Sequence, residues 1–131
     1  MGFLIGVVLA LGVGVFLTVF RMDRDRATYP VIMIVIALIY ELFAVMGGST
    51  QALLIESAIG VAVTIAGFRS TLWLVAAALA GHGIFDLFHG RFIHNPGVPE
   101  WWPMFCGAYD VTAAGYLAWL ILRNKINPAL T

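Results

Sequence analysis

Long apolar runs, separated by short polar breaks, fill most of this sequence. A helix needs about 20 mostly apolar residues to cross the roughly 30 Å of hydrocarbon in a bilayer. Five runs approach that length: residues 2–20, 30–46, 51–68, 71–89 and 104–122. The breaks between them are too short to hold a second domain. The sequence therefore predicts an all-α fold, a five-span transmembrane helical bundle in which residues 1–131 form a single integral-membrane domain.

Composition excludes several other classes of protein. The chain is 62% hydrophobic and 11% charged, whereas a soluble domain is about 45–50% apolar and about 25% charged. Fourteen charged side chains cannot cover a globular surface of this size, so a soluble monomer is excluded. A net charge of zero leaves no basic face for nucleic acid, and the expected surroundings are the lipid bilayer. The single cysteine, Cys106, excludes an internal disulfide and any CxxC motif.

The basic residues indicate how the predicted spans are oriented. With five spans, six of the seven basic residues fall on one side of the membrane: Arg21, Arg24, Arg26, Arg69, Arg123 and Lys125. Only Arg91 falls on the other side. Cytoplasmic loops carry the excess of lysine and arginine. We therefore expect a multi-pass protein of the cell (inner) membrane, with its N-terminus outside and its C-terminus cytoplasmic.

Small residues recur at every fourth position in the first run, at Gly2, Gly6, Ala10 and Gly14. Such a stripe lets two helices approach closely where lipid supplies no hydrophobic drive for association. Packing inside the bundle is the favoured interpretation. The alternative is a homo-oligomer, or a partner in a larger membrane complex, that contacts the same stripe.

Four carboxylates and two histidines lie inside the predicted spans, where a charge costs about 2.5–3.5 kcal/mol at the helix centre. They are Glu41, Glu56, Asp86, Asp110, His82 and His89. Alternate spans run in opposite directions and a helix rises about 1.5 Å per residue, which places all six within roughly 10 Å of the outer surface. Side chains from four spans at one depth indicate a single polar site.

The residue types at this depth favour a bound metal ion. His82, Asp86 and His89 follow i, i+4, i+7 spacing, which places them on one face of a helix. Asp110 of the last span is the fourth predicted ligand. Neutral imidazoles and carboxylates can hold a divalent cation, with zinc as the first choice and iron or manganese as alternatives.

The remaining polar residues have more than one interpretation. Glu41 or Glu56 would act as a general base, or would instead be protonated and hydrogen-bonded within the bundle. Cys106 precedes Asp110 by one helical turn, and a buried cysteine most often packs as a small apolar residue. His94 precedes an Asn-Pro-Gly sequence and is expected to belong to a turn.

Residues 81–89 resemble a pattern in a family of uncharacterised small bacterial multi-span membrane proteins. That pattern is His-x3-Trp-Asp-x2-His, followed by an Asn-Pro turn and by Cys-x3-Asp. Here Asn95 begins the Asn-Pro turn, and Cys106 and Asp110 form the last element. The chain departs from the pattern at Phe85, which replaces the tryptophan and follows His82 after two residues rather than three. The resemblance implies that these positions act together, and it implies no reaction. Alkaline ceramidases also hold zinc near one membrane face. The similarity of this chain to them is confined to the design of the site.

These features predict a membrane-embedded metal-binding protein. The favoured function is a metal-dependent enzyme that acts on a lipid or amphipathic substrate near the outer membrane face. A membrane hydrolase is the reaction type we consider first. One alternative is an accessory metal- or cofactor-binding subunit of a larger membrane complex. Another is a proton or ion relay, although the inner halves of the spans carry no polar pathway.

Overall fold

The computed structural model describes residues 1–129, which contain helices and no strand. The elements are α1 (Gly2–Val19), the short 3-10 helix η1 (Met22–Arg24), α2 (Thr28–Met46), α3 (Thr50–Arg69), α4 (Leu72–Asp86), α5 (His89–Phe92) and α6 (Trp102–Leu122). The predicted all-α fold is confirmed. By length and composition, four of these helices could cross a membrane: α1, α2, α3 and α6.

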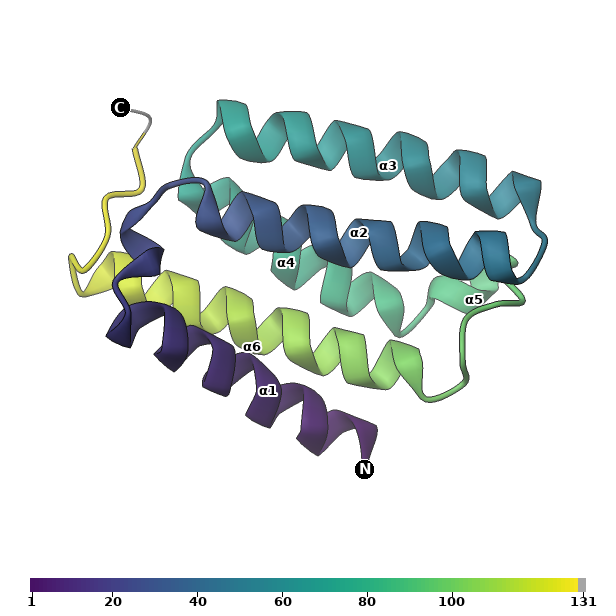
Figure 1. Ribbon diagram of the computed structural model, residues 1–131, viewed down its shortest axis with the longest axis horizontal. Coiled ribbons are helices and arrows are strands. Elements are labelled where there is room, and N and C mark those ends of the chain that lie inside the picture. Colours follow the sequence, from purple (N-terminus) through teal and green to yellow (C-terminus); the bar gives the residue numbers. More distant parts are fainter. Residues whose placement is uncertain (130–131) are drawn as a thin grey trace.

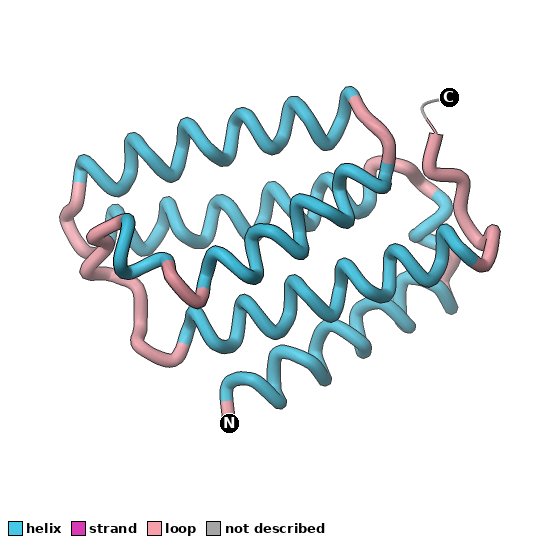
Figure 2. The backbone as a smooth tube through the Cα atoms, turned by 180° about the vertical axis from the view of Figure 1, so that it is seen from behind, coloured by secondary structure: helices cyan, strands magenta, loops and turns pink. Residues whose placement is uncertain are grey.

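The long helices lie side by side and alternate in direction. Helices α1, α3 and α6 run one way, and α2 and α4 run the other way (Figure 1). The connecting segments gather at the two ends of the bundle (Figure 2). One end holds the short helix α5 together with the start of α6, and we call it the α5 end. The opposite end holds η1, and we call it the η1 end.

Helix boundaries follow local chemistry. Helix α2 begins two residues before Pro30. Proline is tolerated in the first turn of a helix because the N–H group that it lacks would have no helical partner there. Pro103 lies at the start of α6 in the same way. The Ser49 side chain caps α3 by accepting a hydrogen bond from the backbone N–H of Ala52 at 3.2 Å.

The predicted run 71–89 is not one continuous helix. Helix α4 contains 15 residues and ends at Asp86, which gives it a length of about 22 Å. The backbone N–H groups of Leu87 and Phe88 then bond to carbonyls three residues earlier, which tightens the chain into a turn. Because of this turn, His89 begins the separate helix α5.

Helix α6 lies between α1 and α4 and packs extensively against both. Small residues make these contacts possible. A side chain at Gly6 of α1 would overlap the backbone carbonyl of Phe105. A Cβ added at Gly83 of α4 would lie 2.8 Å from the carbonyl oxygen of Gly107. Gly2, Gly6 and Gly14 of the small-residue stripe therefore lie against the α6 segment within the chain.

Buried side chains divide into an apolar part and a polar part. The apolar core includes fully buried residues of α4 and α6, namely Leu72, Val75, Leu79, Leu117 and Leu120. The buried polar residues near the α5 end are Glu56, Asp86, His89, Asn95 and Asp110. This segregation brings the ionisable residues of separate helices together at one end of the bundle.

Candidate metal centre

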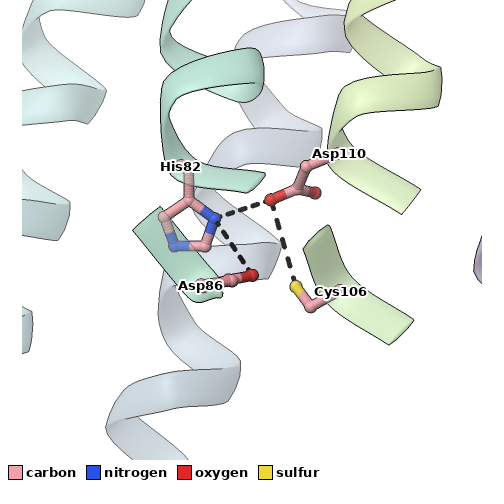
Figure 3. A group of neighbouring side chains, drawn as sticks. All are labelled: His82, Asp86, Cys106 and Asp110. Atoms are coloured by element: carbon pink, nitrogen blue, oxygen red, sulfur yellow. Dashed lines mark hydrogen bonds and ion pairs between the residues drawn. The ribbon is translucent and has the colours of Figure 1, made fainter. Parts of the chain in front are cut away.

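Four potential metal ligands face one another across the contact between α4 and α6. His82 and Asp86 lie one turn apart on α4, and Cys106 and Asp110 lie one turn apart on α6 (Figure 3). One ligand atom from each of these residues lies within 4.8 Å of the others. We call His82, Asp86, Cys106 and Asp110 the α4–α6 cluster.

Hydrogen bonds hold the α4–α6 cluster in place. The Nδ1 atom of His82 lies 2.6 Å from Oδ2 of Asp110 and 3.8 Å from Oδ2 of Asp86. The Cys106 thiol donates to the same Asp110 oxygen at an S–O distance of 3.9 Å. Both aspartate side chains are fully buried, whereas 31% of the His82 side chain is exposed. The histidine is therefore the accessible member of the cluster.

Two carboxylate oxygens in the cluster lack hydrogen-bond partners among the described residues. They are Oδ2 of Asp86 and Oδ1 of Asp110, and both are buried. A buried acceptor without a partner costs about 1–3 kcal/mol, and more when it is charged. A divalent cation within the cluster would satisfy Oδ2 of Asp86, whereas Oδ1 of Asp110 points away from the other three side chains (Figure 3). The donor set, with imidazole nitrogen, thiolate sulfur and carboxylate oxygen, is one that zinc accepts.

Tyr40 of α2 supports the cluster from the side. Its hydroxyl donates to Oδ1 of Asp86 at 2.7 Å. Its ring centroid lies 5.6 Å from that of His82 and 4.8 Å from that of His89. Tyr40 therefore fixes one cluster carboxylate and packs against both histidines.

A second polar group lies on the other side of Tyr40. Glu56 of α3 pairs with His89, whose Nε2 is 3.0 Å from Oε1 of the glutamate. The Asn95 side-chain amide donates to the same oxygen at 3.2 Å and to the Tyr40 backbone carbonyl at 3.2 Å. We call Glu56, His89 and Asn95 the Glu56 group. All three residues are buried.

The predicted ligand set is brought together in part. His82, Asp86 and Asp110 meet in the α4–α6 cluster, whereas His89 lies in the Glu56 group. The physical reason is the end of α4 at Asp86, which interrupts the helical face that His89 was expected to share. Cys106, expected to be a small apolar residue, is the fourth member of the cluster instead.

The two predicted general bases lie in different surroundings. Glu56 lines a cavity of about 60 Å³, together with Tyr40, His82 and Asp110. This volume is large enough for water. Glu41 is not among the residues that line the cavity. Its Oε1 atom lies beside Gly60 of α3, 3.3 Å from where a Cβ on that glycine would be.

The loop between α5 and α6 contributes Asn95, a buried residue that was not among the predicted ligands or bases. Asn95 is buried against α2 and α3, and its place in the Asn-Pro pattern was the available signal. The His94 side chain is exposed, and its backbone carbonyl accepts from the Ser49 hydroxyl at 3.3 Å. His94 is thus a loop residue outside the α4–α6 cluster.

Comparisons of the chain with protein-family models, with curated proteins and with solved structures found no match. Helical bundles host many unrelated activities, so the fold does not identify a function. What this chain does is therefore inferred from the chemistry of its own buried polar residues.

Proposed function

We propose that this chain is a membrane-embedded, metal-dependent hydrolase that acts on a lipid or amphipathic substrate near the outer membrane face. The observation that supports the proposal is the meeting of two fully buried carboxylates, those of Asp86 and Asp110. They belong to different helices and lie beside an imidazole and a thiol. Ionisable side chains inside membrane spans are costly and mark functional sites, and a bound cation would compensate these carboxylates.

His82, Asp86 and Asp110 would hold the ion in this proposal, which leaves the fourth position of a tetrahedral zinc site open for water. The Cys106 thiol donates a hydrogen bond to Asp110, one of these three ligands. Zinc is the favoured metal, with iron or manganese as alternatives. When bound, such an ion makes water acidic enough to supply hydroxide near neutral pH. Tyr40 orients the Asp86 carboxylate through its 2.7 Å hydrogen bond, which resembles the support that other metal ligands receive from neighbouring residues.

Glu56 is the proposed general base. Its carboxylate lines the same cavity as His82 and Asp110, and it takes a proton from water held there. His89 and the Asn95 amide both contact Oε1, so the carboxylate has a fixed orientation. In this account His89 positions the base and is not a metal ligand, and Glu41 lies outside the cavity.

The proposed topology has five spans, with the N-terminus outside and the C-terminus cytoplasmic, in the inner membrane. Supporting it, the long helices alternate in direction (Figure 1), and Arg24 and Arg26 lie in or next to η1. Helix α4 is shorter than the bilayer core, and α5 extends the same stretch of chain at its outer end. With this orientation the metal centre lies near the outer membrane face.

Hydrolysis of p-nitrophenyl esters of increasing chain length, by protein reconstituted in nanodiscs, tests the proposal. A chelator should abolish turnover and zinc should restore it. Glu56→Gln should lower kcat by about 100-fold or more, the contribution of a general base. Glu41→Gln is the matched control and should retain activity.

Two results would overturn the hydrolase assignment. One is a Glu56→Gln protein as active as the wild type. The other is a metal-loaded wild type that hydrolyses none of the esters and co-purifies with a stoichiometric membrane partner, which is the behaviour of an accessory subunit.

A further inference from the structure

An apolar groove runs between α1 and α2, with α6 as its floor. Its volume is about 370 Å³, and its walls include Leu9 and Val13 of α1, Val35 and Ile39 of α2, and Phe105 of α6. We call it the α1–α2 groove. No charged residue lines it within the described chain, so its occupant is apolar where it contacts these walls.

The volume of the groove decides what kind of occupant it fits. A volume of about 370 Å³ lies within the range of about 300–1,000 Å³ that is typical of small-molecule sites. A helix of ten residues is about 15 Å long and about 10 Å wide, which is a volume of roughly 1,200 Å³. The groove is therefore too small to enclose a helix from a second copy or another protein, and it fits a slender hydrocarbon chain.

The groove reaches the metal centre. Cys106 lines the groove, and its sulfur lies 3.9 Å from Oδ2 of Asp110. Ile36 lines both the α1–α2 groove and the cavity that contains Glu56. An occupant of the groove thus contacts Cys106 of the α4–α6 cluster. The side chain of Ile36 separates the groove from the cavity that contains Glu56.

We propose that the α1–α2 groove binds one acyl chain of a membrane lipid and directs the polar end of that lipid toward the α4–α6 cluster. That the lipid is the substrate rests on the proposed hydrolase function, whereas binding of the chain does not. The substrate class is then an acyl lipid that enters sideways from the bilayer between α1 and α2.

Photo-cross-linking with a diazirine-bearing palmitate, in phosphatidylcholine nanodiscs, tests this site. Labelled peptides should contain groove residues of α1, α2 and α6, and excess unlabelled palmitate should compete. Val35→Trp fills the groove and should reduce this labelling to background. Leu38→Trp is the matched control, because Leu38 is exposed on α2 and does not line the groove, and its labelling should remain.

The outcomes separate this proposal from the proposed function. Competed labelling that Val35→Trp removes supports the groove even if no ester is hydrolysed, and the same labelling in Asp86→Asn shows that it is independent of the metal. Labelling that unlabelled palmitate does not displace, or that Val35→Trp leaves unchanged, overturns the proposal. So does a wild-type oligomer that Val35→Trp dissociates, since a second copy would then occupy the groove.

Discussion

Tyr40 connects the two polar groups at the α5 end. Its hydroxyl bonds to Asp86, its backbone carbonyl accepts from Asn95, and its ring packs against His82 and His89. Tyr40 is therefore a single buried side chain in contact with both polar groups.

Replacing Asn95 by alanine should destabilise the protein. The substitution removes a donor from Glu56 and another from the Tyr40 carbonyl, and buried groups left without a partner cost about 1–3 kcal/mol. The measurement is the free energy of unfolding in detergent. His94→Ala is the adjacent control and should be close to neutral, because its side chain is exposed. Equal stability of the two variants would contradict the role given to Asn95.

Part of the site could be predicted from depth and spacing. Depth and spacing predicted that His82, Asp86 and Asp110 lie close together, and they do. Helix direction and the rise per residue are enough to estimate the height of each side chain along the bundle. Asn95 could not be placed in this way because it lies in a loop. The loop is held against α2 by tight packing, and a side chain at Gly97 would overlap the carbonyl of Phe43. Hydrophobic periodicity contains no information about such a contact.

At the scale of elements, the close approach of α4 and α6 creates the cluster. Gly83 and Gly107 face each other, and a Cβ added to either would lie within 2.8 Å of the other's carbonyl oxygen. Both are buried. The backbones therefore approach closely enough for ligands one turn apart on each helix to meet.

Gly83→Ala should separate the two helices and weaken metal binding. Forcing extra volume into a packed contact costs about 1–3 kcal/mol, and the displaced ligands should bind the metal at least about tenfold more weakly, the smallest effect expected for supporting residues. Zinc titration and thermal unfolding measure the two effects. Gly81→Ala is the control, since nothing lies within 4 Å of a Cβ there. Similar zinc affinities in the two variants would show that the glycine contact does not position the ligands.

Helix positions were predictable because long apolar runs and polar breaks mark them. The end of α4 was not, since Leu87 and Phe88 continue the apolar pattern without a glycine or proline to interrupt it. The turn there accompanies the burial of His89 against Glu56, which is a tertiary contact. Local sequence preference is weak compared with such contacts.

At the scale of the whole molecule, the two ends of the bundle differ in charge. The chain around η1 contains Arg21, Arg24 and Arg26, whereas the α5 end holds the buried Glu56, Asp86, His89 and Asp110. Basic segments remain cytoplasmic during insertion. The distribution of basic residues therefore favours the proposed orientation, in which the α5 end faces outward.

Cysteine labelling of intact cells tests this orientation. His94→Cys at the α5 end and Lys125→Cys after α6 place new thiols at exposed positions, while the native Cys106 is buried and should stay unlabelled. A membrane-impermeant maleimide should label the thiol at position 94 and not the one at position 125. The wild type is the control for Cys106. Labelling only at position 125 would reverse the proposed topology.

Metal content tests the central claim most directly. Protein purified in detergent without added metal should contain about one equivalent of zinc, iron or manganese by elemental analysis, as a single metal site requires. Asp86→Asn should be nearly metal-free, and Glu41→Gln, a matched loss of an acid outside the α4–α6 cluster, should retain the metal. A wild type without metal, or an Asp86→Asn protein with its full content, would contradict the assignment of His82, Asp86, Cys106 and Asp110 as a metal centre.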